Sequence, residues 1–462
     1  AIELAHDEIE RAGLMSSAGE MAFQSGRLEE AMELLEAAHQ AFAAAGAPRE
    51  AARVVTDVAK ALIRLGRLTE AVEQLEGALE LLGDVGLDAD RAALNSQLAR
   101  ALFFAGRYGE SIARTEIALE LSQALGIHDV LCSALAQKAN ACLYTGRAEE
   151  ARILYEGARR VAERHNLVAD LANVMTNLSN HGLMWDFPDA LDNAEAGLAL
   201  TRRRGDRYGE SITVGNIAAM FLPRGRWGEI DQMGEELLGH GDERPGASFI
   251  HHRLGQLAAM RGDLDRARHE FQHNDEWADS GDEELQSMFL VARANLELGA
   301  GNPDAAFDSA KENLTKYLGS LSPATEAVRD GWPVALEAAR QLAQPERARE
   351  LVDLLASEPP GHIPPFLEAQ LARGRALVDA LGGEHDLVER ELTRAIDGFR
   401  ALGHPYWLAV TQVDLAEWLI GQGRAGEAQA ILAEAIPVLT DLGARPALER
   451  IQALTGPDRA AV

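Results

Sequence analysis

The chain has few cysteines and few basic residues. Cys132 and Cys142 are the only cysteines in 462 residues. Ten residues along one expected helix separate their Cα atoms by about 15 Å, which is beyond the reach of a disulfide bond. We therefore expect both to be small buried apolar residues in a reducing compartment.

Basic residues number 44 against 73 acidic residues, which gives a net charge of −29. Such a charge repels phosphate groups, so we expect neither nucleic acid nor an anionic membrane as a partner. No apolar run approaches the roughly 20 residues that cross a bilayer, and the first residues lack the pattern of a signal peptide. These absences predict a cytoplasmic chain.

Motifs that carry chemistry are also scarce, since no phosphate-binding loop, nucleophile elbow or cysteine pair of metal-binding spacing occurs. The run 269–273, HEFQH, matches the zinc pattern HExxH. We expect it on the outer helix of a repeat among solvated acidic side chains, and a metalloenzyme remains a remote alternative. The run 421–426, GQGRAG, follows an expected helix and not a strand, so we interpret it as a turn. We expect no enzyme and no cofactor.

A two-helix unit is what the sequence does have, and residues 50–83 show it clearly. On both sides of Gly66 the apolar residues keep the spacing of an amphipathic helix, and the glycine separates the two helices into an antiparallel hairpin. The unit recurs with separations of 37 to 42 residues between equivalent turn positions. These are Gly26, Gly66, Gly106, Gly146, Trp185, Gly225, Gly262, Gly301, Ala343, Gly383 and Gly423.

Small residues recur at fixed distances from these turns, as Ala59, Ala71 and Ala78 do around Gly66. Small side chains allow neighbouring helices to approach closely, as a stacked array requires. The pattern resembles the tetratricopeptide repeat (TPR) family, in the variant with a period near forty residues. The resemblance implies an all-α, right-handed TPR-type superhelical solenoid of about eleven helical hairpins. We expect each hairpin to contact only its neighbours.

The same pattern predicts the limits of the array. Residues 1–11 resemble the tail of a preceding helix, which implies that the chain is part of a larger protein. The array is expected over residues 12–442, with degenerate repeats over 170–320 and a stiff, extended, proline-rich connector over 357–365. Residues 443–462 are expected to form a capping helix and a polar tail.

In the TPR family the first helix of each repeat lines the concave side, where ligands bind. By the resemblance, the residues thirteen, ten, six, three and two before each turn position face this groove. In repeats two to four they form a cationic and aromatic surface that suits an acidic peptide or small anion. In repeats five to eight they are apolar and rich in methionine, and this groove is either open to an apolar ligand or closed by inward packing. The candidate binding residues are Arg53, Lys60, Arg64, Arg100, Phe103, Phe104, Tyr144, Met175, Phe249, Met260 and Met288.

Residues 401–451 resemble the C-terminal repeats of bacterial signalling proteins in which cyclase and ATPase domains precede a TPR array. They are also similar to the arrays of MalT-like and LuxR-type activators. Both resemblances imply a regulatory arm that receives a partner and acts on upstream domains of its own parent chain. Two hypotheses stay open: a protein or peptide-binding scaffold in signal transduction, and an inducer-binding domain for a small molecule.

Overall fold

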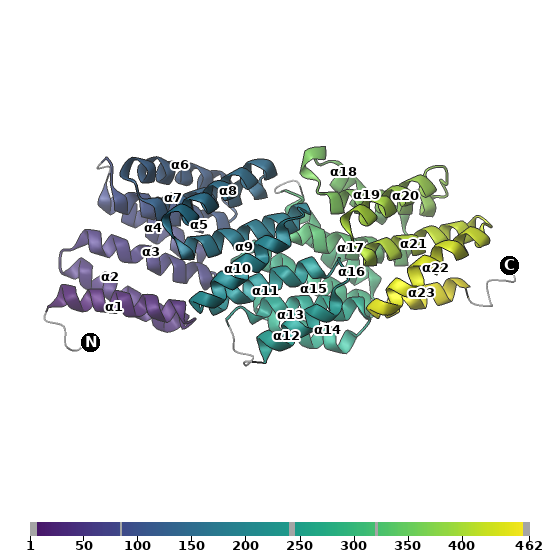
Figure 1. Ribbon diagram of the computed structural model, residues 1–462, viewed down its shortest axis with the longest axis horizontal. Helices are drawn as coiled ribbons and strands as arrows, with labels where there is room; N and C mark the ends of the chain where they lie inside the picture. The colour runs from purple at the N-terminus through teal and green to yellow at the C-terminus, as the bar shows by residue number, and fades with distance from the viewer. Residues whose placement is uncertain (1–6, 84–85, 240–244, 319–321, 456–462) are drawn as a thin grey trace. The chain divides into compact units, whose positions relative to one another are not determined.

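The computed structural model describes residues 7–83, 86–239, 245–318 and 322–455. Within these ranges the chain is all-α, with no β-strand, and Figure 1 shows successive helices running back and forth. The helices are α1 (Glu8–Gln24), α2 (Leu28–Ala44), α3 (Pro48–Arg64), α4 (Leu68–Leu82), α5 (Ala89–Phe104), α6 (Tyr108–Leu125), α7 (His128–Tyr144), α8 (Ala148–His165), α9 (Val168–Trp185), α10 (Ala190–Arg204), α11 (Arg207–Phe221), α12 (Trp227–Leu238), α13 (Ala247–Met260), α14 (Leu264–Phe271), α15 (Glu283–Gly299), α16 (Pro303–Tyr317), α17 (Glu326–Leu342), α18 (Pro345–Ala356), α19 (Pro365–Gly382), α20 (Val388–Leu402), α21 (Pro405–Gly421), α22 (Ala425–Leu442) and α23 (Arg445–Thr455).

The helices from α1 to α22 form eleven hairpins, which confirms the predicted TPR-type solenoid of all-α repeats. The hairpin of α3 and α4 shows why they form. Gly66 is in the left-handed conformation, and the amide of Arg67 donates to the carbonyl of Leu62. This Schellman-type ending stops α3 and lets α4 fold back.

The predicted small residues lie where helices pack. Ala59 and Ala71 are fully buried, as are Leu62 and Leu75 beside them. Cys132 and Cys142 are buried free thiols, as expected. Burial raises the pKa of the Cys132 thiol to about 12, so this thiol is inert at neutral pH.

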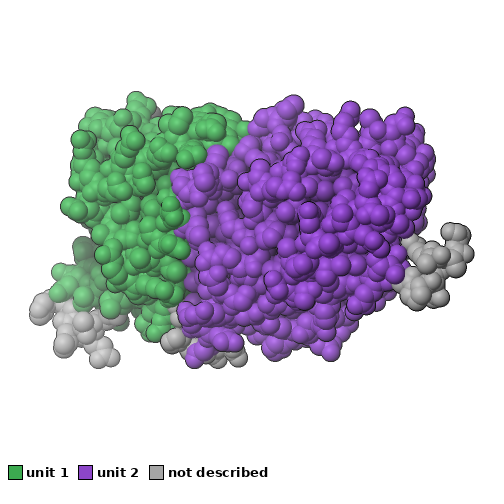
Figure 2. Space-filling view, turned by 45° about the vertical axis from the view of Figure 1, so that its right-hand side comes forward, with its two compact units in different colours: residues 1–181, 192–213, 279–286 green, residues 182–191, 214–278, 287–462 purple. Residues whose placement is uncertain are grey.

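The chain divides into two compact units, which Figure 2 colours green and purple. Unit 1 comprises residues 1–181, 192–213 and 279–286. Unit 2 comprises residues 182–191, 214–278 and 287–462.

Unit 2 closes on itself, which contradicts the prediction that each hairpin contacts only its neighbours. The guanidinium Nε of Arg445 on α23 donates to the carbonyl of Arg261 at the end of α13, at 2.9 Å. A Cβ on Gly225 would lie 2.9 Å from the ring of Pro405. The curvature of the stacked hairpins therefore brings the ends of unit 2 together.

Three predicted boundaries change. Helix α1 begins at Glu8 with Asp7 as its N-cap, so residues 8–11 belong to the first hairpin and not to a preceding helix; residues 1–6 lie outside the described ranges. The connector 357–365 is not simply extended, because Pro360–His362 form a 3-10 turn. The degenerate region contains the short α14, which continues as a 3-10 helix over Gln272–Asp279.

The predicted capping helix is α23, which buries Ile451 and Leu454. The polar tail, residues 456–462, lies outside the described part of the chain. Among the described helices, none combines the length and the apolar character needed to span a bilayer.

Candidate functional site

Two arginines of unit 1 lie against aromatic rings without an ion-pair partner in the described part of the chain. The guanidinium carbon of Arg64 lies 4.1 Å from the ring centre of Phe23 and 4.2 Å from that of Tyr208. Arg100 lies 5.9 Å from the ring of Phe104. Burial lowers the pKa of both arginines, and the charge of Arg64 lowers that of Arg100 further. An anion beside them would be attracted to both.

An aromatic cluster continues this surface. The ring of Phe103 lies edge-on to Tyr108 and Tyr144 at 5.5 and 5.1 Å, and the two tyrosine rings stack at 5.7 Å. Phe103 and Tyr144 are buried, which corrects the expectation that they are exposed in an open groove. The chain itself covers part of this surface.

The covering element is an acidic segment, residues 279–286, with the sequence DSGDEELQ. The hydroxyl of Tyr144 donates to Glu284 Oε2 at 2.7 Å. A Cβ on Gly106 would lie 3.5 Å from Glu283 Oε2, and one on Gly281 would lie 2.4 Å from the carbonyl oxygen of Gly66. The acidic segment therefore lies along the turns that end the first helices of repeats two, three and four.

The carboxylates of this segment raise the pKa of the tyrosine hydroxyls that they face. Burial makes the largest contribution to the raised pKa of Tyr144 and of Tyr108, and the charge of Glu284 makes the next largest. Burial also raises the pKa of Tyr208, and Asp282 contributes to that increase. All three phenols therefore stay protonated and can donate hydrogen bonds to carboxylates.

The other predicted cations in unit 1 are neutralised locally. Arg53 Nε donates to Asp90 Oδ1 at 2.7 Å, and Lys60 Nζ donates to Asp57 Oδ1 at 2.7 Å. These contacts leave Arg64 and Arg100 as the uncompensated pair among the four predicted cations.

The predicted apolar residues separate into two groups. Met175 and Met288 are buried between helices, and Phe249 packs with its ring 5.6 Å from that of Trp277. Inward packing therefore accounts for these three. Met260 instead lines a cavity in unit 2.

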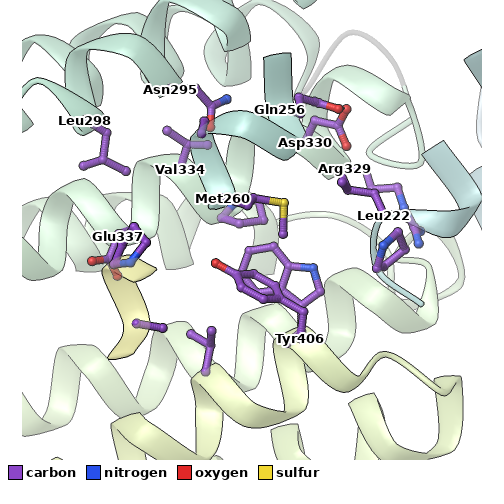
Figure 3. Close-up of a pocket in the computed structure, with 18 of the residues that line it drawn as sticks. Leu222, Gln256, Met260, Asn295, Leu298, Arg329, Asp330, Val334, Glu337 and Tyr406 are labelled. Atoms are coloured by element: carbon purple, nitrogen blue, oxygen red, sulfur yellow. The ribbon is translucent and has the colours of Figure 1, made fainter. Parts of the chain in front are cut away.

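This cavity has a volume of about 280 Å³ and is shown in Figure 3. Its wall comes mainly from the first helices of the unit 2 hairpins, α11 to α21, and from α23. The lining includes Leu222, Met260, Arg329, Glu337, Tyr406 and Trp407. These first helices are the ones that the resemblance to TPR arrays assigns to the concave side.

Four arginines of the wall are paired with carboxylates. Arg253 pairs with Glu326 and with Asp330, and Arg340 pairs with Glu337. Two arginines share a further carboxylate, since Arg373 Nε lies 2.5 Å from Asp414 and Arg450 Nη1 lies 2.6 Å from it. These two arginines offset the effect of burial and hold the pKa of Asp414 at about 2. Arg340, Arg373 and Arg450 also border a second cavity of about 460 Å³.

The fifth arginine, Arg329, is held at a strained turn. Its Nη2 donates to Asp186 Oδ1 at 2.6 Å, and its guanidinium carbon lies 4.4 Å from the ring of Phe366. Asp186 has a φ of 57° at a turn where most repeats have glycine, and it also accepts from the amide of Phe366 at 2.9 Å. Burial lowers the pKa of the nearby His404 to about 3, so this imidazole is neutral. Burial and the charge of Arg329 also lower the pKa of Arg224.

Of the candidate binding residues, only Met260 lies in the wall of this cavity. The positions that the TPR resemblance assigns to the groove, counted back from each turn, nevertheless include many residues of the wall. The residues six, three and two before Gly262 and before Gly301 all line the cavity. All five rule positions before Ala343 line it as well; they are Asp330, Pro333, Glu337, Arg340 and Gln341. The candidate binding residues come from repeats two to eight, whereas much of the wall comes from repeats nine to eleven.

The HEFQH run forms no metal-binding group within the described residues. Among the neighbouring acidic side chains, Asp265, Glu276 and Asp279 are exposed, as expected. Glu270 itself is buried, and its Oε2 lies 2.7 Å from His251 Nδ1. The two histidines of the run lie on either side of the end of α14, with ring centres 5.7 Å apart.

No protein-family model and no curated protein sequence matches the chain. Several solved structures are similar to it over most of its length. Cut9, from an APC/C hetero-tetramer with Hcn1, is 12% identical, with 98% of this chain and 95% of that chain covered and a TM-score of 0.49. Human IFIT1, as a dimer with m7Gppp-AAAA, is 12% identical over 84% of this chain and 90% of that chain, with a TM-score of 0.45. A Rap protein complexed with competence and sporulation factor is 10% identical over 96% and 99% of the two chains, with a TM-score of 0.35. At these identities the likeness concerns the fold alone, and m7Gppp-AAAA and competence and sporulation factor belong to those proteins only.

Proposed function

We propose that the chain is a non-catalytic scaffold that binds an acidic peptide of a partner protein on the first-helix surface of unit 1. The observation that carries the proposal is the acidic segment itself, because it already lies on the surface that the sequence predicts for such a peptide. Arg64 and Arg100 supply positive charge, and Tyr144 supplies a hydrogen-bond donor for a carboxylate.

The acidic segment is then an internal occupant that a partner peptide displaces. An internal ligand competes at a high effective concentration, so a partner must bind more tightly or reach the surface when the segment is released. This competition suits a regulatory arm. We therefore place the chain in a cytoplasmic, bacterial signal-transduction protein, on the strength of its resemblance to the arrays of cyclase, ATPase and LuxR-type proteins.

Fluorescence anisotropy with a labelled peptide of sequence DSGDEELQ tests the proposal. In the variant D282N/E283Q/E284Q the internal segment loses its charge, and we expect the peptide to bind at least tenfold more tightly than to the wild-type chain. Adding Arg64→Gln to this variant should weaken the binding again. Arg390→Gln, which changes an exposed arginine of unit 2, is the matched control and should have no effect.

Equal affinity of the peptide for the wild-type chain and the triple variant would contradict displacement. Absence of binding to the triple variant would contradict the proposed surface. A peptide of sequence DSGNQQLQ, which keeps the length and loses three charges, should bind neither form.

A further inference from the structure

The cavity of unit 2 is independent of the surface of unit 1, and it has the features of a small-molecule site. Its volume of about 280 Å³ is close to the lower end of the range for ligand pockets, about 300–1,000 Å³. It is bounded by several helices of one unit, so a ligand inside it would contact side chains of several repeats at once. Figure 3 shows Met260 and Tyr406 at the centre, with polar side chains around them.

Arg329 has one guanidinium nitrogen in this wall that lacks a hydrogen-bond partner within the described ranges. The residue is only 6% exposed, and its Nη1 is buried without a hydrogen-bond partner in the described part of the chain. A buried guanidinium N–H without an acceptor is unfavourable, and a carboxylate oxygen is its strongest partner. A ligand that brings such an oxygen would therefore gain this interaction.

The charges at this end of the cavity balance in number. Arg224, Arg253 and Arg329 are set against Asp186, Glu326 and Asp330, and His404 is neutral. What this end offers an anion is the Nη1 of Arg329, which is unpartnered among the residues that the structure describes. The other arginines of the wall are already paired with carboxylates, so the cavity offers one free guanidinium face, which fits a monoanion better than a phosphate dianion.

The rest of the wall suits an apolar group. Leu222, Met260 and Val410 line it together with the rings of Tyr406 and Trp407. Methionine adapts to the shape of a ligand, and flat aromatic rings bury a large area at little cost in conformational entropy. A ligand without an apolar body would leave this part of the wall uncovered.

We propose that this cavity binds a small organic carboxylate with an apolar body, its carboxylate on Arg329 and its body between Met260 and the rings of Tyr406 and Trp407. The guanidinium already has one carboxylate partner, Asp186, on its other edge. Arginine can hold two carboxylates in this way because its donors lie in a rigid plane. The proposal assigns to unit 2 a ligand different from the peptide of unit 1.

Isothermal titration calorimetry tests it with three probes: 4-phenylbutyrate, the uncharged 4-phenylbutanamide, and inorganic phosphate. We expect the carboxylate to bind the full chain at least tenfold more tightly than the amide, and phosphate not to bind. Met260→Trp fills the apolar part of the cavity without touching an ion pair, and it should abolish binding of both organic probes. Arg390→Gln should bind as the wild-type chain does.

The role of Arg329 is tested in the double variant D186N/R329Q, which replaces the ion pair by a neutral hydrogen-bonding pair. This variant should bind the carboxylate and the amide equally, and circular dichroism should show an unchanged helix content. Equal binding of both organic probes by the wild-type chain would overturn the proposal. So would unchanged binding in Met260→Trp, binding of phosphate alone, or no binding of 4-phenylbutyrate at millimolar concentration.

Discussion

Two residues in the left-handed conformation show how the same backbone geometry has different consequences. Ala343 and Asp186 both have a φ above 50° at a repeat turn, where an L-residue costs about 1–2 kcal/mol. Ala343 is exposed at the end of α17. The side chain of Asp186 is only 5% exposed, and its carboxylate accepts hydrogen bonds from Arg329 and from the amide of Phe366. The strain at Asp186 is therefore compensated by its contacts, whereas that at Ala343 is not.

Ala343→Gly should raise the free energy of unfolding by about 1 kcal/mol, because glycine adopts this conformation without strain. Urea denaturation measures the change. A decrease in stability would show that the side chain of Ala343 makes a contact that this structure lacks.

Asp186→Gly should do the opposite and lower the free energy of unfolding by about 3 kcal/mol. The relief of strain is the same, but a buried arginine loses its carboxylate, which costs about 3–5 kcal/mol. Asp186→Asn, in which the residue tolerates the backbone conformation and loses only its charge, is the control. Its free energy of unfolding should lie between those of the wild-type chain and Asp186→Gly. Stabilisation by Asp186→Gly would contradict the role of the ion pair.

His404 makes stability depend on pH. Its pKa is about 3 in the folded chain, because of burial and of Arg329, and about 6.5 when unfolded. The unfolded chain therefore binds a proton that the folded chain does not, and stability falls as the pH drops from 6.5 towards 3. From pH 7.5 to 5.0, the stability of His404→Gln should improve relative to wild type by about 2 kcal/mol. A constant difference would show that His404 is not a neutral buried group.

At the scale of the element, the repeat pattern was sufficient to predict the hairpins. Their turns end at left-handed residues such as Gly66 and Gly423, and small residues mark where helices meet. Local rules of this kind depend on a few neighbouring residues, so one sequence reveals them. The closure of unit 2 depends instead on the summed curvature of many hairpins, and the sequence gives no local sign of it.

The candidate binding surface was predicted less well for a related reason. The positional rule placed Arg64, Arg100 and Tyr144 on the first helices, but it could not show that residues 279–286 return to cover them. This contact joins Tyr144 to Glu284 across 140 positions of sequence. No helical periodicity reports such a distant pairing.

Helix packing within unit 2 gives a further test. A Cβ on Gly255 of α13 would lie 2.6 Å from the ring of Phe271, which is buried and cannot easily move. Gly255→Ala should therefore destabilise the chain by about 1–3 kcal/mol in thermal or urea denaturation. Gly157→Ala in α8 is the matched control. No atom lies within 4 Å of its new Cβ, so it should stabilise by about 0.5–1 kcal/mol.

At the scale of the whole molecule, we propose that the two units have separate recognition tasks. Unit 1 would bind an acidic peptide with its cations and phenols, and the cavity of unit 2 would bind a carboxylate on Arg329, whose Nη1 has no hydrogen-bond partner among the described residues. Both surfaces come mainly from the first helices of the hairpins. A stacked array suits this division, because distant repeats can diverge without disturbing each other.

Hydrogen–deuterium exchange, measured by mass spectrometry with and without the peptide DSGDEELQ, tests most directly whether the acidic segment is an internal ligand. The account predicts faster exchange over residues 279–286 when saturating peptide is present. Exchange at the ends of α3, α5 and α7 should stay slow, since one occupant replaces another. Bound peptide with unchanged exchange in the acidic segment would contradict the account.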